Sequence, residues 1–313
     1  MSDKNTKVIV VVGPTASGKT SLGVALAKSL DGEVVSCDSM QIYKGMPIAS
    51  AAPTADETDG IPHHLVGFKD PIEKFSVADF VELASSKVDE IVSREHRPIL
   101  VGGTGLYIDS LVSGVSFCDE DNTEVRAKLE AEADEKGVEV LLERLRKIDP
   151  ETAVKYHLND RKRIIRALEI FEIHKKTKTQ LDLESKQKGD RYDALWLGIT
   201  YRNREILYDR INRRVDIMLK NGLLEEAKNA FDSGFGSTAV QAIGHKEFFP
   251  YFKGEIPLET AVENLKMETR RYAKRQLTWF RRNEKINWIY ADETPDVVTE
   301  AKKIICEKEL RLR

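Results

Sequence analysis

With 313 residues, 41% of them hydrophobic and 32% charged, the chain has the balance of an ordinary globular protein and is long enough for one large domain with an appendage. Its longest early apolar run, Val8–Val12, is far shorter than the roughly 18 residues of a membrane helix, and its three cysteines form no CxxC pair. We therefore expect a cytoplasmic protein with no membrane segment and no structural zinc site. The net charge of −3 does not exclude binding to nucleic acid, because local clusters of basic residues matter more for such binding than the summed charge.

The first part of the chain alternates between strand-like and helical patterns. Strands are predicted at Val8–Val12, Glu33–Cys37 and Pro98–Val101, and helices at Ser21–Leu30 and Val77–Arg94. We interpret His63 and His64, which precede the second helix, as loop residues rather than metal ligands. The alternation predicts an α/β fold in which helices flank a parallel sheet and sites lie at the carboxyl ends of its strands.

The pattern then changes to charged amphipathic helices without a convincing strand. We interpret residues 115–192 as an all-helical insertion domain, and residues 1–114 and 193–313 as the α/β core. In the second part of the core, strands are predicted at Ala194–Ile199 and Ile286–Tyr290. Helices are predicted at Asn203–Lys220, Leu223–Ser233 and Thr269–Asn283. The last of these helices is basic, and its Trp279 and Phe280 are expected in the core.

The loop after the first strand has the sequence of a phosphate-binding loop. The segment Gly13-Pro14-Thr15-Ala16-Ser17-Gly18-Lys19-Thr20 matches G-x-x-x-x-G-K-[ST] at each fixed position, between a predicted strand and a predicted helix. In such a loop, backbone N–H groups converge on phosphate oxygens, Lys19 supplies a positive charge and Thr20 can hold Mg²⁺. The motif makes the predicted sheet P-loop NTPase-like, but it does not say whether phosphorus or carbon is attacked.

A carboxylate ends the second predicted strand beside this loop. In an NTPase, Asp38 would organise Mg²⁺. It could equally act as a base toward an acceptor. Spacing alone leaves the two roles open.

Five segments, in this order along nearly the whole chain, resemble the tRNA dimethylallyltransferases, also called tRNA isopentenyltransferases. They are the phosphate loop, Asp38-Ser39-Met40-Gln41-Ile42-Tyr43, Val101-Gly102-Gly103-Thr104-Gly105-Leu106-Tyr107, Asn159-Asp160 to Arg166-Ala167-Leu168-Glu169, and Lys274-Arg275-Gln276-Leu277-Thr278-Trp279. With no CxxC or paired histidines near Arg313, the chain looks like the bacterial form. It departs from the expected pattern at His245, where we would expect a tyrosine.

The resemblance implies transfer of a dimethylallyl group from dimethylallyl diphosphate to N6 of the adenosine just 3′ of the anticodon, in tRNAs that read codons beginning with U. Asp38 would accept the amine proton, Thr104 would lie beside the adenine, and Lys19 with Mg²⁺ would stabilise the leaving diphosphate. Arg210 and Arg214, four residues apart on one helix face, would meet the diphosphate opposite the loop. The alternatives are a turn residue for Thr104 and a solvated helix face for the arginines. We expect a monomer.

The resemblance also implies contacts with the tRNA anticodon stem-loop. The residues concerned are Asp38, Ser39, Met40, Gln41, Thr104, Arg126, Lys162, Arg163, Ile164, Ile165, Arg166, Gln241, Ala242, Ile243, Gly244, His245 and Lys246. The cations that follow Asp160 lie in the first turns of a predicted helix, where the helix dipole disfavours positive charge. A bound phosphate would resolve that conflict, and simple solvation is the alternative. The target adenosine is expected to flip out of its stack, at a cost of a few kcal/mol.

Two other classes of function stay open from the residues alone. A small-molecule kinase would use the same loop to move the γ-phosphoryl group of ATP, with the insertion as a lid. A noncatalytic nucleotide switch or RNA-binding module would tolerate the loss of Asp38.

Overall fold

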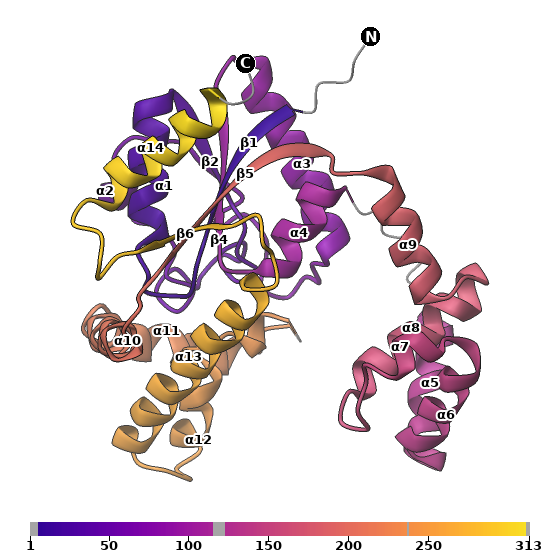
Figure 1. The fold of residues 1–313 in the computed structure, drawn as a ribbon. Coiled ribbons are helices and arrows are strands. Elements are labelled where there is room, and N and C mark those ends of the chain that lie inside the picture. Colours follow the sequence, from indigo (N-terminus) through magenta and orange to yellow (C-terminus); the bar gives the residue numbers. More distant parts are fainter. Residues whose placement is uncertain (1–5, 115–122, 237, 311–313) are drawn as a thin grey trace. The chain divides into compact units, whose positions relative to one another are not determined.

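The computed structural model describes residues 6–114, 123–236 and 238–310. The chain divides into two compact units, a core unit of Met1–Val112 with Arg191–Arg313 and a helical unit of Ser113–Asp190 (Figure 1). The division thus follows Val112 and Asp190, where the sequence analysis placed it after residues 114 and 192. The first residues of the predicted insertion, 115–122, lie outside the described part of the chain.

The core unit contains a six-stranded sheet in which every described strand pair is parallel. The spatial order is β3-β2-β4-β1-β5-β6, with strands β1 (Thr6–Val12), β2 (Gly32–Ser36), β3 (His63–His64), β4 (Arg97–Gly102), β5 (Tyr192–Thr200) and β6 (Asn287–Tyr290). Val8 to Val12 of the central strand β1 are buried, as expected for a strand covered on both faces. The predicted P-loop NTPase-like fold with a parallel sheet is confirmed.

Helices cover both faces of this sheet (Figure 1). α1 (Lys19–Leu30) and α14 (Val297–Leu310) pack on one face around Leu22, Leu26 and Ile305, while α3 (Val77–Ser93) and α4 (Gly105–Ser113) lie on the other. On that second face the rings of Phe80 and Tyr107 stack 4.3 Å apart. The remaining helices of the unit are α2 (Ala55–Thr58), α10 (Arg204–Lys220), α11 (Leu223–Ser233), η1 (Ala239–Gln241), η2 (Lys246–Phe248), α12 (Phe249–Phe252) and α13 (Leu258–Phe280).

Several elements differ from the sequence-based expectation in extent or existence. α13 begins at Leu258 rather than Thr269, since Ala261 and Leu265, one turn apart, continue its buried stripe toward the N-terminus. α4 and α14 were not predicted. The edge strand β3, with two residues, is too short to show a period in the sequence. Within the described ranges, no helix combines the length and apolarity needed to cross a bilayer.

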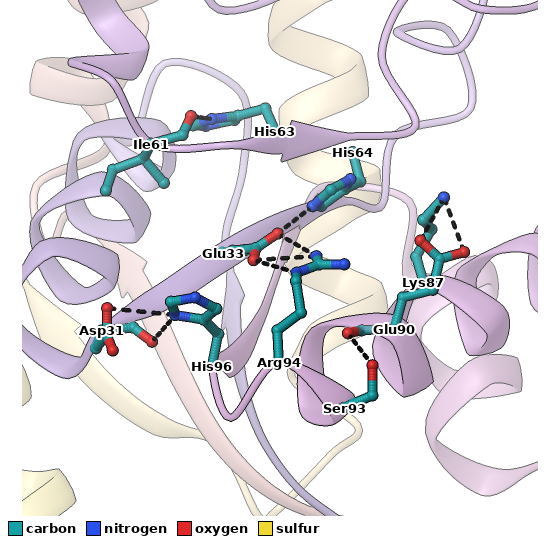
Figure 2. Close-up of polar contacts among 10 residues, drawn as sticks. All are labelled: Asp31, Glu33, Ile61, His63, His64, Lys87, Glu90, Ser93, Arg94 and His96. Atoms are coloured by element: carbon teal, nitrogen blue, oxygen red, sulfur yellow. Dashed lines mark hydrogen bonds and ion pairs between the residues drawn. The ribbon is translucent and has the colours of Figure 1, made fainter.

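The two adjacent histidines lie in β3, at the edge of the sheet, and His64 contacts the buried Glu33 of β2 (Figure 2). His64 Nε2 is 2.6 Å from Glu33 Oε2, and Arg94 Nη2 donates to the same oxygen over 2.8 Å. Burial alone would raise the pKa of Glu33, but the hydrogen bonds from Arg94 and His64 hold it below its usual value. This cluster fastens β3 and the end of α3 to β2.

The helical unit has a core of its own. It consists of α5 (Thr123–Lys136), α6 (Val138–Ile148), α7 (Pro150–Ala153), α8 (Arg161–His174) and α9 (Lys178–Lys188), and the structure describes no strand between Thr123 and Asp190. Leu129, Leu141, Leu145 and Leu168 are buried in its centre. Asp149 begins α7 by accepting a hydrogen bond from Thr152 N over 3.1 Å.

Candidate functional site

A cavity of about 320 Å³ lies in the core unit, where the chain leaves β1, β2 and β4. This is the edge at which ligands bind in parallel α/β sheets. The cavity is lined by Thr15, Lys19, Thr20, Asp38, Ser39, Met40, Gln41, Ala49, Ser50, Ala51, Val101, Gly102, Gly103, Ile211, Arg214, Val215, Met218, Gln241, Ile243, Gly244, Lys246, Leu265, Thr269, Tyr272, Arg275 and Gln276. The fold thus brings the phosphate loop together with Asp38, Arg214 and the segment that contains Lys246.

The phosphate loop passes so close to β5 that it requires glycine. A Cβ on Gly13 would lie 2.3 Å from the carbonyl oxygen of Ile199, and Gly18, the N-cap of α1, has φ of 101°. Lys19 Nζ donates to Pro14 O over 2.8 Å, so the amine folds back on its own loop. The N-terminus of α1 faces the cavity through Lys19 and Thr20, an arrangement suited to an anion.

Two cations beside this loop, Lys19 and Arg214, have lowered pKa values. Burial is the main cause that lowers the pKa of Lys19 to about 7, and the charge of Arg214 lowers it further, while Asp38 opposes the shift. Burial also lowers the pKa of Arg214 below its usual value, against the attraction of Glu57 and Asp38. A phosphate group in the cavity would supply the charge that favours both cations.

Asp38 is held in place by the loop that it begins. Its Oδ1 accepts hydrogen bonds from Met40 N at 2.9 Å and Gln41 N at 3.4 Å. Among the described residues, Oδ2 has no hydrogen-bond partner, which leaves one carboxylate oxygen available to a ligand in the cavity. The carboxylate is therefore oriented by backbone donors and presents its second oxygen for chemistry.

Thr104 connects the segments that follow β2 and β4 by hydrogen bonds. Its Oγ1 accepts a hydrogen bond from Ser39 N over 3.1 Å, and its own N–H donates to Cys37 O over 3.3 Å. The cavity wall itself is formed by the preceding Gly102 and Gly103, so Thr104 lies just behind it. A Cβ on Gly102 would lie 2.2 Å from Cys37 O, which explains the glycine at this crossing.

Two residues of α13 complete the site, and the sequence analysis assigned them no role. Gln276 Oε1 accepts a hydrogen bond from Thr15 N over 2.8 Å, and its Nε2 donates to Gly103 O over 3.0 Å. Tyr272, one turn earlier, hydrogen-bonds to Thr104, and its pKa is raised mainly by burial and also by the charge of Asp38. Their four-residue spacing was visible in the sequence, but the helix was interpreted through its basic charge.

One wall of the cavity is apolar. Ala49, Val215, Met218 and Leu265, from three separate segments, line it and belong to one hydrophobic cluster, whereas Ile211 packs with Ala16 of the phosphate loop. The segment that carries Ala49 is held by a carboxylate of α11, because Glu226 accepts hydrogen bonds from Ile48 N at 2.8 Å and from Ala49 N at 2.9 Å. A cavity with cations at one end and aliphatic side chains at the other suits a ligand that has a charged head and a short hydrocarbon tail.

Of the residues predicted at 241–246 to contact tRNA, His245 and Ala242 do not line the cavity. The side chain of His245 is fully buried, and its Nε2 lies 2.8 Å from Glu226 Oε1. Ala242 is also buried, whereas Gln241, Ile243, Gly244 and Lys246 line the cavity. His245 therefore positions the loop 241–246 through Glu226 instead of facing a ligand.

Arg210 also differs from its predicted place. Its side chain does not line the cavity; instead its Nε donates to Ala16 O over 2.9 Å, and its guanidinium lies 5.3 Å from the ring of Tyr201. Arg210 thus supports the backbone of the phosphate loop, and its contact with a diphosphate stays a prediction. Arg214, one turn later, is the arginine of α10 that lines the cavity.

The cations predicted near the start of α8 are mostly neutralised by their own unit. Arg126 and Arg166 each donate to Oε2 of the buried Glu169 over 2.9 Å, and Arg163 donates to Asp160 over 2.7 Å. Neighbouring carboxylates thus offset part of the positive charge near the start of α8. Lys162 is exposed and has no ion pair among the described residues.

The side chains of Ile164 and Ile165, two of the residues predicted to contact tRNA, do not reach solvent. Both isoleucines are buried in the core of the helical unit. In α8, the side chains of the predicted stretch that reach solvent are those of Lys162, Arg163 and Arg166.

Comparison with known proteins identifies close relatives along nearly the whole chain. The model of the family described as IPP transferase matches residues 41–283. A tRNA dimethylallyltransferase of Acetivibrio thermocellus is 49% identical over 289 residues, which cover 91% of this chain and 92% of that protein. A tRNA isopentenylpyrophosphate transferase of Bacillus halodurans is similar in structure, with a TM-score of 0.69, 43% identity and coverage of 99% and 100% of the two chains. A eukaryotic dimethylallyltransferase acting on tRNA gives a TM-score of 0.82 at 31% identity, over 98% of this chain and 80% of that one.

Proposed function

This chain belongs to the IPP transferase family and is a tRNA-prenylating enzyme, and from that membership and the cavity we propose its substrates. It transfers a dimethylallyl group from dimethylallyl diphosphate to N6 of the adenosine immediately 3′ of the anticodon, in tRNAs that read codons beginning with U. The products are N6-isopentenyladenosine and diphosphate. The enzyme acts as a monomer in the cytoplasm, where its tRNA substrates are.

The observation that carries this proposal is the division of one cavity into a charged end and an aliphatic end. Lys19, Thr20 and Arg214 lie at the charged end, and Val215 and Leu265 are part of the aliphatic wall. A five-carbon prenyl chain fits such a wall. The kinase alternative is not favoured, because the relatives that this chain resembles along nearly its whole length are tRNA dimethylallyltransferases.

The chemistry divides between the two ends of the cavity. The allylic C–O bond breaks and both of its electrons leave with the diphosphate, whose growing negative charge is stabilised by the N-terminus of α1, Lys19 and Arg214. The N6 lone pair forms the new N–C bond. As that bond forms, the N6 proton passes to Oδ2 of Asp38, the carboxylate oxygen without a hydrogen-bond partner among the described residues.

The residues present fit a Mg²⁺ ion that is held mainly by the substrate. The described residues contain no group of three His, Cys, Asp or Glu side chains arranged for a metal. Mg²⁺ commonly binds through one or two protein oxygens and substrate phosphates, and Thr20, whose hydroxyl could serve as one of them, lines the cavity at the start of α1. When bound, the ion would neutralise charge on the leaving diphosphate.

We place the anticodon stem-loop on predicted contact residues that are at least partly exposed. Ser39, Met40, Gln41, Gln241 and Lys246 surround the cavity in the core unit, and Lys162, Arg163 and Arg166 offer cations in the helical unit. Thr104 supports the acceptor side from behind Gly103. Such contacts would position the backbone, while the flipped base enters the cavity.

The test is a labelling experiment. The protein is incubated with labelled dimethylallyl diphosphate and unmodified tRNA, and in parallel with labelled ATP. Label that co-migrates with tRNA and is found on N6 of the adenosine 3′ of the anticodon supports the proposal. Turnover of ATP without prenylated RNA would overturn it in favour of a kinase.

A further inference from the structure

The apolar wall of the cavity follows α10 away from the phosphate loop. Along this helix the cavity is lined by Ile211, Arg214, Val215 and Met218, at the three- and four-residue spacing of one helix face. Ile211 packs with Ala16 of the phosphate loop. Arg214 and Met218 therefore lie at increasing distance from that loop, the cation before the thioether.

A second helix, α13, runs beside α10 in the opposite direction and forms the same wall. Arg270 Nη1 donates to Asn212 Oδ1 over 2.6 Å. One turn further along α10, Asp216 Oδ1 pairs with Lys266 Nζ over 2.9 Å. The number of the α13 residue falls by four as that of the α10 residue rises by four, so the two helices are antiparallel. This register places Leu265 level with the last turn that α10 contributes to the cavity.

Past this level, side chains fill the interior of the core unit. Met218 is partly exposed and packs against a hydrophobic cluster. The buried members of that cluster are Val215, Leu223, Ala227, Phe248, Ala261 and Leu265. Packed interiors leave few voids larger than a water molecule. A hydrocarbon chain that starts at the charged end therefore meets this cluster, and it extends further only where a side chain gives way.

The distance from the cation to this end of the wall matches a five-carbon prenyl chain. Met218 follows Arg214 by four residues, a rise of about 6 Å along the helix axis. An extended chain advances about 1.2 Å per bond, so the four bonds from the ester oxygen to the end of a dimethylallyl group span about 5 Å. A second isoprene unit would extend past this level and into the space of the Met218 side chain.

We propose that Met218 determines the length of the prenyl donor, because it closes the apolar end of the cavity to chains longer than five carbons. This inference rests on the proposed transfer from a prenyl diphosphate. The side chain of Met218 acts through its volume, and it carries no charge that could stabilise the leaving diphosphate. Its truncation should therefore widen the range of donors without removing the groups that perform the chemistry.

The test compares dimethylallyl diphosphate with geranyl diphosphate, which has one isoprene unit more, as donors to unmodified tRNA. Met218→Ala is preferred to Leu265→Ala, because Leu265 is 2% exposed and its truncation would leave a hole in the buried cluster. In Met218→Ala, the ratio of kcat/KM for geranyl diphosphate to that for dimethylallyl diphosphate should rise by about tenfold or more, since one methylene in an apolar pocket changes selectivity by about 10–200-fold. Mass spectrometry of the digested tRNA identifies the group that was transferred.

Two matched variants serve as controls. Met218→Leu keeps an apolar side chain of similar volume and should keep the selectivity of the wild type. Ile217→Ala truncates the neighbouring apolar residue, which is 56% exposed and does not line the cavity, and it should match the wild type with both donors.

The outcomes separate this inference from the function on which it rests. Geranyl transfer that appears in Met218→Ala, and in neither the wild type nor the controls, supports the role of Met218. With a wild type that transfers the dimethylallyl group, three results overturn that role alone: unchanged selectivity in Met218→Ala, loss of both transfers in that variant, or an equal gain in Ile217→Ala. A wild type that uses both donors equally well overturns it too. A wild type that transfers neither group to tRNA would overturn the proposed function itself.

Discussion

The side-chain amide of Gln276 binds the backbone of Thr15, with Oε1 accepting a hydrogen bond from Thr15 N over 2.8 Å. Its Nε2 donates to Gly103 O over 3.0 Å, so one buried side chain of α13 spans the phosphate loop and the exit of β4. Tyr272, one turn earlier on the same helix, hydrogen-bonds to Thr104. The side of α13 that faces the cavity thereby fixes the distance between the phosphate loop and the end of β4.

Replacement of Gln276 by alanine should loosen the phosphate loop. The change leaves the Thr15 N–H and the Gly103 carbonyl without their partner, which costs about 1–3 kcal/mol of unfolding free energy for buried groups. We expect a lower midpoint of urea unfolding and a KM for dimethylallyl diphosphate that rises about tenfold. Gln276→Glu keeps an acceptor for Thr15 N and should fall between the alanine variant and the wild type. An alanine variant with wild-type stability and KM would contradict the role given to this amide.

The sequence predicted the elements that carry motifs and missed the contacts between distant segments. The phosphate loop, Asp38 and the strands before them follow from local pattern, and the structure brings Lys19 and Asp38 to one cavity. Gln276 contacts residues 261 and 173 positions away, and no periodicity reports such a pairing. Similarly, Ile164 and Ile165 belong to a conspicuously basic stretch, but their apolar spacing serves the core of the helical unit. Arg210 and Arg214 share a helix face, yet only Arg214 reaches the cavity.

Because the pKa of Lys19 is lowered, we expect diphosphate binding to depend on pH. In the free protein this pKa is about 7, so above that pH the amine is mostly neutral. A bound diphosphate favours the charged amine and raises its pKa. Binding should therefore take up protons at about pH 8, and the affinity for diphosphate should fall as the pH rises above about 7.

Calorimetry at about pH 8 in two buffers with different ionisation enthalpies measures this uptake directly. Lys19→Met, which has a side chain of similar length without the charge, should bind diphosphate more weakly and lose this part of the proton uptake. Equal uptake in the wild type and the methionine variant would assign the protons to another group.

Asp38→Asn is a cleaner test of the base than Asp38→Ala. The side-chain oxygen of asparagine can still accept the hydrogen bonds from Met40 N and Gln41 N, so the loop should keep its shape. The proton acceptor is lost, and kcat should fall by about 10²–10⁴-fold while the Kd for tRNA changes little. Single-turnover prenylation and filter binding measure the two quantities. If the asparagine variant turns over like the wild type, Asp38 is not the base.

Glu226 should be important for the apolar wall although it does not line the cavity. Its carboxylate accepts hydrogen bonds from Ile48 N and Ala49 N and contacts Nε2 of the buried His245. Glu226→Ala leaves all three groups without this partner and should lower the unfolding free energy by about 1.5–3 kcal/mol. The KM for dimethylallyl diphosphate should rise. Glu225→Ala, which removes the adjacent carboxylate that no described residue contacts, serves as the control. A Glu226 variant as stable as this control would show that the carboxylate is dispensable.

Lys162 offers a test of tRNA binding by the helical unit that leaves its fold intact. Arg166→Ala removes a partner of the buried Glu169 and should destabilise the unit, so weaker tRNA binding in that variant has two explanations. Lys162 has no ion pair among the described residues, and Lys162→Ala should leave thermal unfolding unchanged. We expect it to weaken tRNA binding a fewfold and to lower the slope of log K against log salt by about 0.7–0.9, the value for one phosphate contact.

The matched control is Lys147→Ala, which removes an exposed lysine of α6 in the same unit. Equal salt slopes for the Lys162 and Lys147 variants would reject the contact, and the start of α8 would then be a solvated basic face whose remaining charges are offset by Asp160 and Glu169.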